Sequence, residues 1–185
     1  MYNERKAAQM AAFLLGKTPE GRMSHLKLMK LLYLAERESM RLTGLPICWD
    51  HLVSMPHGPV LSMTLNLMDG DVESQPGGWE EWISDKAGHE VSLRRSFTPE
   101  DLDALSRAEE DILESVWQEF GGMGKWEIRD WTHQHCPEWT NPSGSSMPIP
   151  FHAMALAVGY SEAEASELAE RIETEQNIDA LYASL

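Results

Sequence analysis

Cysteine is scarce in this chain, and long apolar runs are missing from it. Cys48 and Cys136 are the only cysteines among 185 residues, and two cysteines outside a CxxC pair do not make a disulfide framework. No apolar run approaches the roughly 20 residues that cross a bilayer. The run from Ala7 to Leu15 is too amphipathic for a signal peptide. We therefore expect a cytoplasmic protein with no membrane partner.

Basic residues are also few. Lys and Arg total 15 against 30 Asp and Glu, so the net charge is −15. An acidic surface repels phosphate backbones, so nucleic acid is not an expected partner. A solvated surface explains the charge best, and a face that steers a basic partner is the more specific interpretation. Residues 1–50 hold eight basic and five acidic residues, so a regulator that touches DNA through them is a minor alternative.

The familiar catalytic and nucleotide-binding motifs are missing as well. The chain has no P-loop, GxGxxG, HExxH, GxSxG or EF-hand loop. These absences remove the simplest arguments for an enzyme. We expect a protein that binds another protein, with no catalytic residue and no cofactor.

Apolar residues recur at helical spacing over most of the chain. Segments 47–55 and 91–95 are expected to be extended and to pair with each other, and 140–150 has the composition of a loop. The pattern predicts a mostly α protein. We expect a single compact helical domain of about six helices with a minor two- or three-stranded β element. The helices are expected over 4–15, 24–42, 59–68 (with Pro59 first), 98–120 (capped by Thr98), 125–135, 149–159 and 161–182.

The first informative segment is the helix that contains Lys27 to Ala35. One face of this helix is apolar, and another carries a basic stripe at helical spacing. A solvated face with exposed ion pairs, each worth ~0.5 kcal/mol, is the simpler interpretation. The stripe is nevertheless the best candidate for a partner-binding surface. It consists of Lys27, Lys30, Leu34, Arg37 and Arg41.

The second segment is Met55 to Val60. Gly58 lies between His57 and Pro59 and lets the backbone turn sharply. A structural corner is the favoured interpretation, because a lone His without a placed acid or nucleophile supports little chemistry. The exposed side of His57 joins the basic stripe in the candidate partner surface.

The third segment is Asp130 to Trp139. His133, His135 and Cys136 lie close together in sequence and are potential metal ligands. Their spacing is not a zinc pattern, and on a helix the two His point to different sides. We favour a structural role, in which the Thr, His and Trp side chains of this segment fix the end of the helix to the core by hydrogen bonds and packing. A metal-dependent hydrolase that uses His133, His135 and Cys136 is a minor alternative.

Together and in this order, the three segments resemble the Panacea domain, a family of phage- and toxin-associated bacterial proteins that includes SocA-like and GepA-like proteins. The family motif K-L-x-K-L-L-Y-x-A with a following G-x-P matches Lys27 to Ala35 and then 44–46. Y-G-P-V matches His57 to Val60, with His57 in place of the usual aromatic residue. L-T-H and P-W match 131–133 and 137–139, where Trp131 replaces the leucine and Glu138 interrupts the Pro-Trp pair.

The resemblance covers about residues 4–140 and implies a Panacea-like helical domain over 1–140. The loop and acidic helix over 141–185 are not part of the family motifs, and we expect them to pack on the same domain. It implies an antitoxin that neutralises a protein toxin, encoded by an adjacent gene, by direct binding. One relative is thought to deliver its toxin to a protease, so a proteolytic adaptor is the alternative. We expect the motif residues to be structural: Tyr33, Gly44, Pro46, Gly58, Pro59, Thr132, His133, Pro137 and Trp139.

Overall fold

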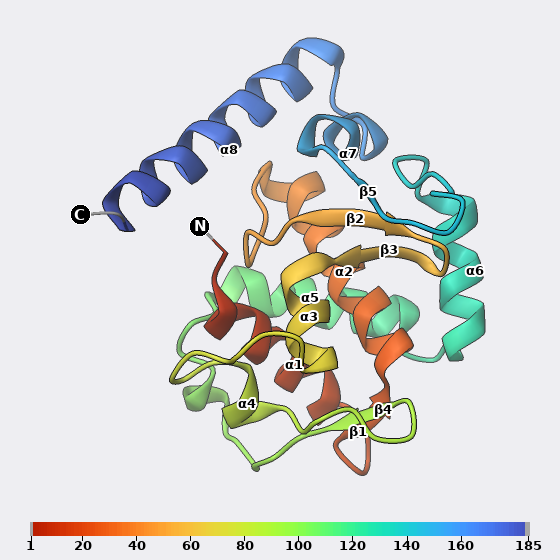
Figure 1. The fold of residues 1–185 in the computed structure, drawn as a ribbon, viewed down its shortest axis with the longest axis vertical. Coiled ribbons are helices and arrows are strands. Elements are labelled where there is room, and N and C mark those ends of the chain that lie inside the picture. The colour runs from red at the N-terminus through yellow and green to blue at the C-terminus, as the bar shows by residue number, and fades with distance from the viewer. Residues whose placement is uncertain (1, 184–185) are drawn as a thin grey trace.

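A computed structural model describes residues 2–183 and confirms the mostly helical fold (Figure 1). Eight α-helices and two small antiparallel sheets occur in this part of the chain. None of the helices in it has both the length and the apolar character that crossing a membrane requires. The helices are α1 (Glu4–Gly16), α2 (His25–Thr43), α3 (Ser62–Asp69), α4 (Trp79–Trp82), α5 (Arg107–Phe120), α6 (Lys125–His135), α7 (Phe151–Ala157) and α8 (Glu162–Ala183).

Helix α2 forms the centre of the molecule. It contacts α1, α5, α6, α7 and two of the strands, and it runs through the middle of the fold (Figure 1). Its predicted apolar face is fully buried, including Leu28, Leu31 and Leu32. Lys30 and Tyr33 lie on other sides of the helix and are also fully buried. The middle of α2 is therefore enclosed all round, which brings its polar side chains into the interior.

The strands pair differently from the sequence-based expectation. In one sheet β1 (Arg22–Ser24) pairs with β4 (Glu90–Ser92). In the other, β2 (Leu52–Met55) lies between β3 (Gly58–Leu61) and β5 (Met147–Pro148). The predicted pairing of segments 47–55 and 91–95 is therefore wrong. Short strands carry little register information, and the two-residue turn between β2 and β3 makes their hairpin the local solution.

Pro59 does not begin a helix, which corrects a second expectation. It lies in β3 opposite Ser54, and α3 begins only at Ser62. Because β3 is an edge strand, a proline in it, which lacks an N–H, does not cost a hydrogen bond inside the sheet. The first turn of α3 is capped from a distance: the Asp50 carboxylate accepts the N–H groups of Met63 at 2.9 Å and Thr64 at 2.8 Å.

The segment expected as one helix over 98–120 is divided. Thr98 caps only a short 3-10 turn, η1 (Pro99–Asp101), and α5 starts again after a second capping box formed by Ser106 and Glu109. Between them the side chain of Gln9 in α1 accepts from the Ala104 N–H at 2.9 Å and donates toward Asp101 O at 3.3 Å. This tertiary contact holds the intervening segment in a non-helical form.

The part of the chain after residue 140 lies along one side of the molecule. Strand β5 extends the β2–β3 hairpin, α7 contacts α2, and α8 packs on α7 (Figure 1). Ser161 and Glu164 form the expected capping box of α8. Within α8, Ala165 and Ile172 are fully buried. The division into 1–140 and 141–185 remains a prediction.

Candidate functional site

The first motif places a lysine in the interior. Lys30 is fully buried, and its Nζ donates to the carbonyl oxygen of Pro59 at 2.7 Å. Burial lowers the pKa of Lys30 to about 7, partly opposed by Cys136. The bond joins the middle of α2 to the beginning of β3, so the first two motif segments are in direct contact.

Gly58 allows a third segment to reach the same point. Its φ is +95°, a conformation that favours glycine, and a Cβ there would lie 3.0 Å from both Lys30 Cε and Thr132 Oγ1. Thr132 is itself fully buried in α6, and its hydroxyl donates to Arg129 O at 2.7 Å. The glycine of the second motif therefore lets α2, β3 and α6 meet closely. We call Lys30, Gly58, Pro59 and Thr132, together with the side chains of Tyr33, Arg37, Glu138, His133 and Trp139 that surround them, the motif cluster.

A buried carboxylate lies at one side of the motif cluster. Oε1 of Glu138 accepts from the Tyr33 hydroxyl at 2.8 Å and from Arg37 Nε at 2.8 Å. Burial first, and then the Glu138 charge, raise the pKa of Tyr33, which keeps its hydroxyl in the donor form. Arg37 also donates to Ala157 O in α7 at 3.3 Å. This network connects α2, the segment after α6 and α7.

Trp139 closes the other side of the motif cluster. Its ring stacks on His133 with centroids 4.1 Å apart and an interplanar angle of 8°. Its Nε1 donates to Met55 O at 3.0 Å, at the end of β2. Burial, and then the charges of Lys30 and Arg129, lower the pKa of His133, so the ring is neutral near pH 7. The histidine and tryptophan motifs together hold the β2–β3 hairpin against α6.

An open groove runs beside the motif cluster. One part is an apolar hollow of about 570 Å³, with Lys30 at its wall and apolar side chains from α2, the hairpin and α3. The other part is a histidine hollow of about 410 Å³ between the starts of α2 and α6. Both parts are lined by His25, Leu26 and His57. We call the two hollows together the His57 groove.

A family model described as "Antitoxin SocA-like, Panacea domain" matches residues 28–140, a span that holds all the motif segments from Leu28 onward. The chain belongs to this family. No curated protein matches it, and no solved structure does. The residues that form the motif cluster all lie inside the matched span of this Panacea chain.

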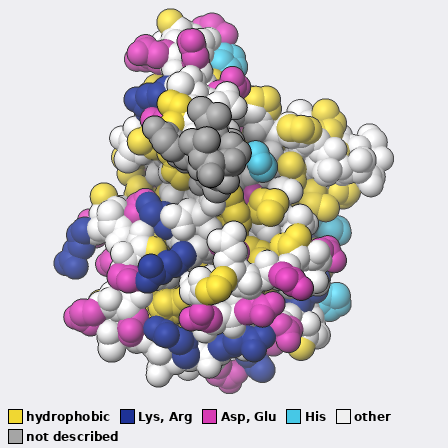
Figure 2. All heavy atoms as spheres, turned by 60° about the vertical axis from the view of Figure 1, so that its left-hand side comes forward, with side chains coloured by type: hydrophobic (Ala, Val, Ile, Leu, Met, Phe, Trp, Pro, Cys, Tyr) yellow, Lys and Arg dark blue, Asp and Glu magenta, His cyan; other side chains and the backbone are white. Residues whose placement is uncertain are grey.

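The predicted basic stripe is not continuous on the surface of this Panacea domain. Lys30 and Leu34 are buried, and Lys27 donates to Gly121 O at 2.6 Å. Arg37 is bound to Glu138, whereas Arg41 is exposed and pairs with Glu38. On the face drawn in Figure 2, Lys and Arg side chains lie among Asp and Glu side chains. Of the six residues proposed to bind a partner, His57 in the turn and Arg41 are the exposed ones, and their role remains a prediction.

Gly44 and Pro46 form the turn after α2. Gly44 caps the helix with φ +71°, and a Cβ there would lie 2.7 Å from Leu168 Cδ2 in α8. The turn is fixed from within by Glu36, which is buried and accepts the N–H groups of Ile47 and Cys48. Turn and helix are thereby held as one unit, against which α8 packs.

The three residues of the metal alternative are not brought together as ligands. His133 stacks on Trp139, while His135 stacks on Trp131. Nδ1 of His135 also forms a hydrogen bond with the backbone carbonyl oxygen of Trp131 at 2.9 Å. Burial raises the pKa of the Cys136 thiol to about 12, which disfavours the thiolate that a metal or a nucleophilic role requires. Among the described residues no group of three or more His, Cys, Asp or Glu is placed to hold a metal ion.

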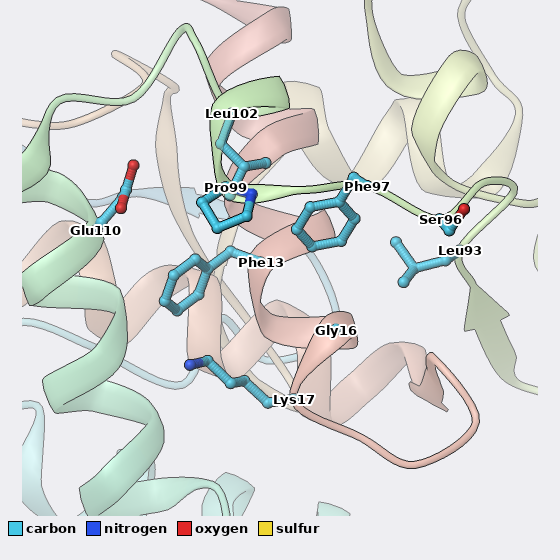
Figure 3. A pocket seen from close by; sticks show the side chains of 9 residues that line it. All are labelled: Phe13, Gly16, Lys17, Leu93, Ser96, Phe97, Pro99, Leu102 and Glu110. Atoms are coloured by element: carbon cyan, nitrogen blue, oxygen red, sulfur yellow. The ribbon is translucent and has the colours of Figure 1, made fainter.

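A separate hollow of about 430 Å³ lies between α1, α5 and the segment before η1. Figure 3 shows the rings of Phe13 and Phe97 at its wall, with Lys17 and Glu110 near its margin. Gly16 permits this packing, because a Cβ there would lie 2.9 Å from Phe97 Cζ. None of the motif residues lines it, so we place the candidate site at the His57 groove.

Sequence reasoning missed three buried acids that organise this region. Glu36, Asp50 and Glu138 each accept two or more hydrogen bonds from groups distant in sequence. Glu138 was noticed only as an interruption of the Pro-Trp pair. A buried carboxylate has no periodic signal of its own, so only the fold shows which acids are interior.

Proposed function

We propose that this chain is an antitoxin that neutralises a protein toxin by binding it directly. The observation that carries the proposal is its membership of the SocA-like antitoxin family over residues 28–140. The raised pKa of the Cys136 thiol and the neutral, stacked His133 also support a binding protein rather than an enzyme. The proposed toxin is encoded by a gene adjacent to that of the antitoxin.

The test is co-expression of the chain with the product of each adjacent gene. We expect the product of one adjacent gene to stop growth when it is expressed alone and to permit growth when it is expressed with this chain. The two proteins should elute together as a stable complex in size-exclusion chromatography. If no neighbour is toxic and none co-purifies, the proposal is wrong. A toxin that is neutralised but also disappears from cells, without forming an isolable complex, would indicate the proteolytic adaptor instead.

The matched control for this test is a variant with a disrupted core. Leu31 is fully buried in the centre of α2, and Leu31→Asp places an unpaired charge there. We expect it to unfold the protein and lose rescue. Rescue that persists with L31D would mean that the folded chain is not what protects the cell.

A further inference from the structure

The histidine hollow has an unusual composition for so acidic a chain. His25, His57, His89 and Lys125 line it together with Ser24 and Trp126. No Asp or Glu is among the described residues that line it, although the whole chain has a net charge of −15. The hollow is thus a place where cationic and hydrogen-bonding groups converge without a carboxylate partner.

The rings are held in place before any ligand arrives. The backbone N–H and the Nδ1 of His25 both bond His89 O, at 3.0 Å and 2.8 Å, and the two rings stack with centroids 5.6 Å apart. Nδ1 of His25 donates to a carbonyl oxygen, so Nε2 is the nitrogen left for a ligand. It donates to a carboxylate only when the ring is protonated, whereas the Lys125 ammonium group donates in every case. His57 packs on the edge of Trp126 at 6.2 Å. Preorganised side chains lose little entropy on binding.

Two helix N-termini begin in the same hollow, α2 at His25 and α6 at Lys125. The N-terminus of a helix attracts negative charge. At α6 the Glu127 side chain already accepts the Gly124 N–H at 3.2 Å. At α2 the Ser24 side chain makes no cap, and its buried Oγ has no hydrogen-bond partner in the described part of the protein. This unpartnered hydroxyl is a second observation that points to a ligand at this end of α2, to which it can donate.

The adjoining apolar hollow indicates that the ligand also carries an apolar group. Met29, Met55, Val60 and Leu65 line it, and its one acid, Asp69, is paired with Lys86. The volume of about 570 Å³ accommodates a bulky side chain. Because both hollows share His57, a ligand that fills them carries a negative group next to an apolar one.

We infer that the His57 groove takes an acidic segment of the protein toxin. A carboxylate of this segment lies in the histidine hollow, and a neighbouring large apolar side chain fills the apolar hollow. This inference rests on the proposed antitoxin function and names the surface and the chemistry through which it acts. A peptide is favoured over a small anion because the apolar hollow, which a lone anion leaves empty, shares His25, Leu26 and His57 with the polar one.

The experiment uses the full-length chain and the toxin identified by the rescue test. The variant His57→Glu/Lys125→Glu changes two exposed side chains of the groove. Its matched control is Arg107→Glu, an exposed basic residue that is the first residue of α5 as Lys125 is of α6. We expect toxin to bind the groove variant at least about tenfold more weakly by calorimetry, with R107E unchanged and all melting temperatures alike.

A photo-reactive benzoylphenylalanine at position 57 then identifies the toxin segment by mass spectrometry. A cross-link to a peptide with an Asp or Glu beside a large apolar residue is expected. Equal toxin affinity of the wild type and the groove variant would overturn the inference while the antitoxin function stands. So would a cross-link to a basic or uncharged segment, or binding of inorganic phosphate in the hollow without any effect on the toxin. If the wild type binds no toxin, the proposed function itself fails.

Discussion

At the scale of single residues, the most unusual ionisable group of the chain is Lys30. Its side chain is enclosed by the central helix, the hairpin and α6, and Pro59 O is its hydrogen-bond acceptor. Charged amines avoid such surroundings, and burial lowers the pKa to about 7. The unfolded chain exposes the same lysine to water, where its pKa is about 10.4. The folded and unfolded states therefore bind different numbers of protons above neutral pH.

This difference predicts a pH dependence of stability that depends on Lys30. Below about pH 7 both states are protonated at this site, and the contribution is constant. Above about pH 7 the folded state loses its proton first, so stability rises with pH by up to about 1.4 kcal/mol per unit. Urea unfolding between pH 6.5 and about 8.5 checks this, and a variant without Lys30 corrects for the thiols of the unfolded chain, which titrate at about pH 8.5.

Lys30→Met is the control for this pH series, because Met is unbranched, only one heavy atom shorter than Lys, and removes the titrating group. The free energy of unfolding of the wild type should rise relative to that of K30M as the pH rises from 7 to about 8.5. Parallel curves for the two proteins would show that Lys30 keeps an ordinary pKa in the folded state.

Gly58 gives a second prediction at this scale. Gly58→Ala forces a Cβ into a backbone with φ +95° and against Lys30 and Thr132, each 3.0 Å away. We expect a loss of about 2 to 4 kcal/mol in the free energy of unfolding. Gly70→Ala is the matched control, because Gly70 has φ +78° and nothing within 4 Å of an added Cβ. The free energy of unfolding of G70A should fall only by the cost of a positive φ for alanine, about 1 kcal/mol. Equal losses in G58A and G70A would mean that Gly58 is not crowded.

At the scale of elements, the sequence predicts those helices that depend on local interactions and misplaces those that depend on tertiary contacts. Periodicity and caps are local, so α1, α2, α6 and α8 lie close to where the sequence places them. The position of α3 depends on Asp50 and the break before α5 depends on Gln9, and both act across the fold. Likewise the motif residues were recognised one by one, but no local pattern shows that Lys30, Gly58 and Thr132 touch.

Helix α8 is the element on which direct neutralisation and proteolytic delivery differ. It carries exposed acids, among them Glu167, Glu170 and Glu173, which make it the natural docking face for a protease under the adaptor alternative. None of these three residues lines the His57 groove, through which we propose direct binding. We therefore expect the triple variant E167Q/E170Q/E173Q to rescue growth and to leave the lifetime of the toxin unchanged, as followed by immunoblot after a translation block. A longer toxin lifetime with intact binding would favour the adaptor.

At the scale of the whole molecule, the matched family span ends at residue 140, but the packing does not end there. Strand β5 pairs with β2, and Arg37 reaches Ala157 O. Arg171 of α8 donates to Gly44 O at 3.3 Å. These contacts reach the turn after α2, the hairpin and the network around Glu138, so they adjoin the motif cluster and share Arg37 with it.

We therefore predict that the chain unfolds as one cooperative unit and that residues 1–140 alone lack a stable fold. Truncation removes the buried side chains of Ile149, Met154 and Ile172. At about 1.5 to 3 kcal/mol for each large apolar side chain, the loss is comparable with the 5 to 15 kcal/mol that hold an ordinary domain together. Calorimetry should show one transition for the full chain and none for the 1–140 chain. A 1–140 chain that melts cooperatively near the full-length temperature would establish two independent units instead, because the contacts of β5, α7 and α8 would then add nothing to the stability of the motif cluster.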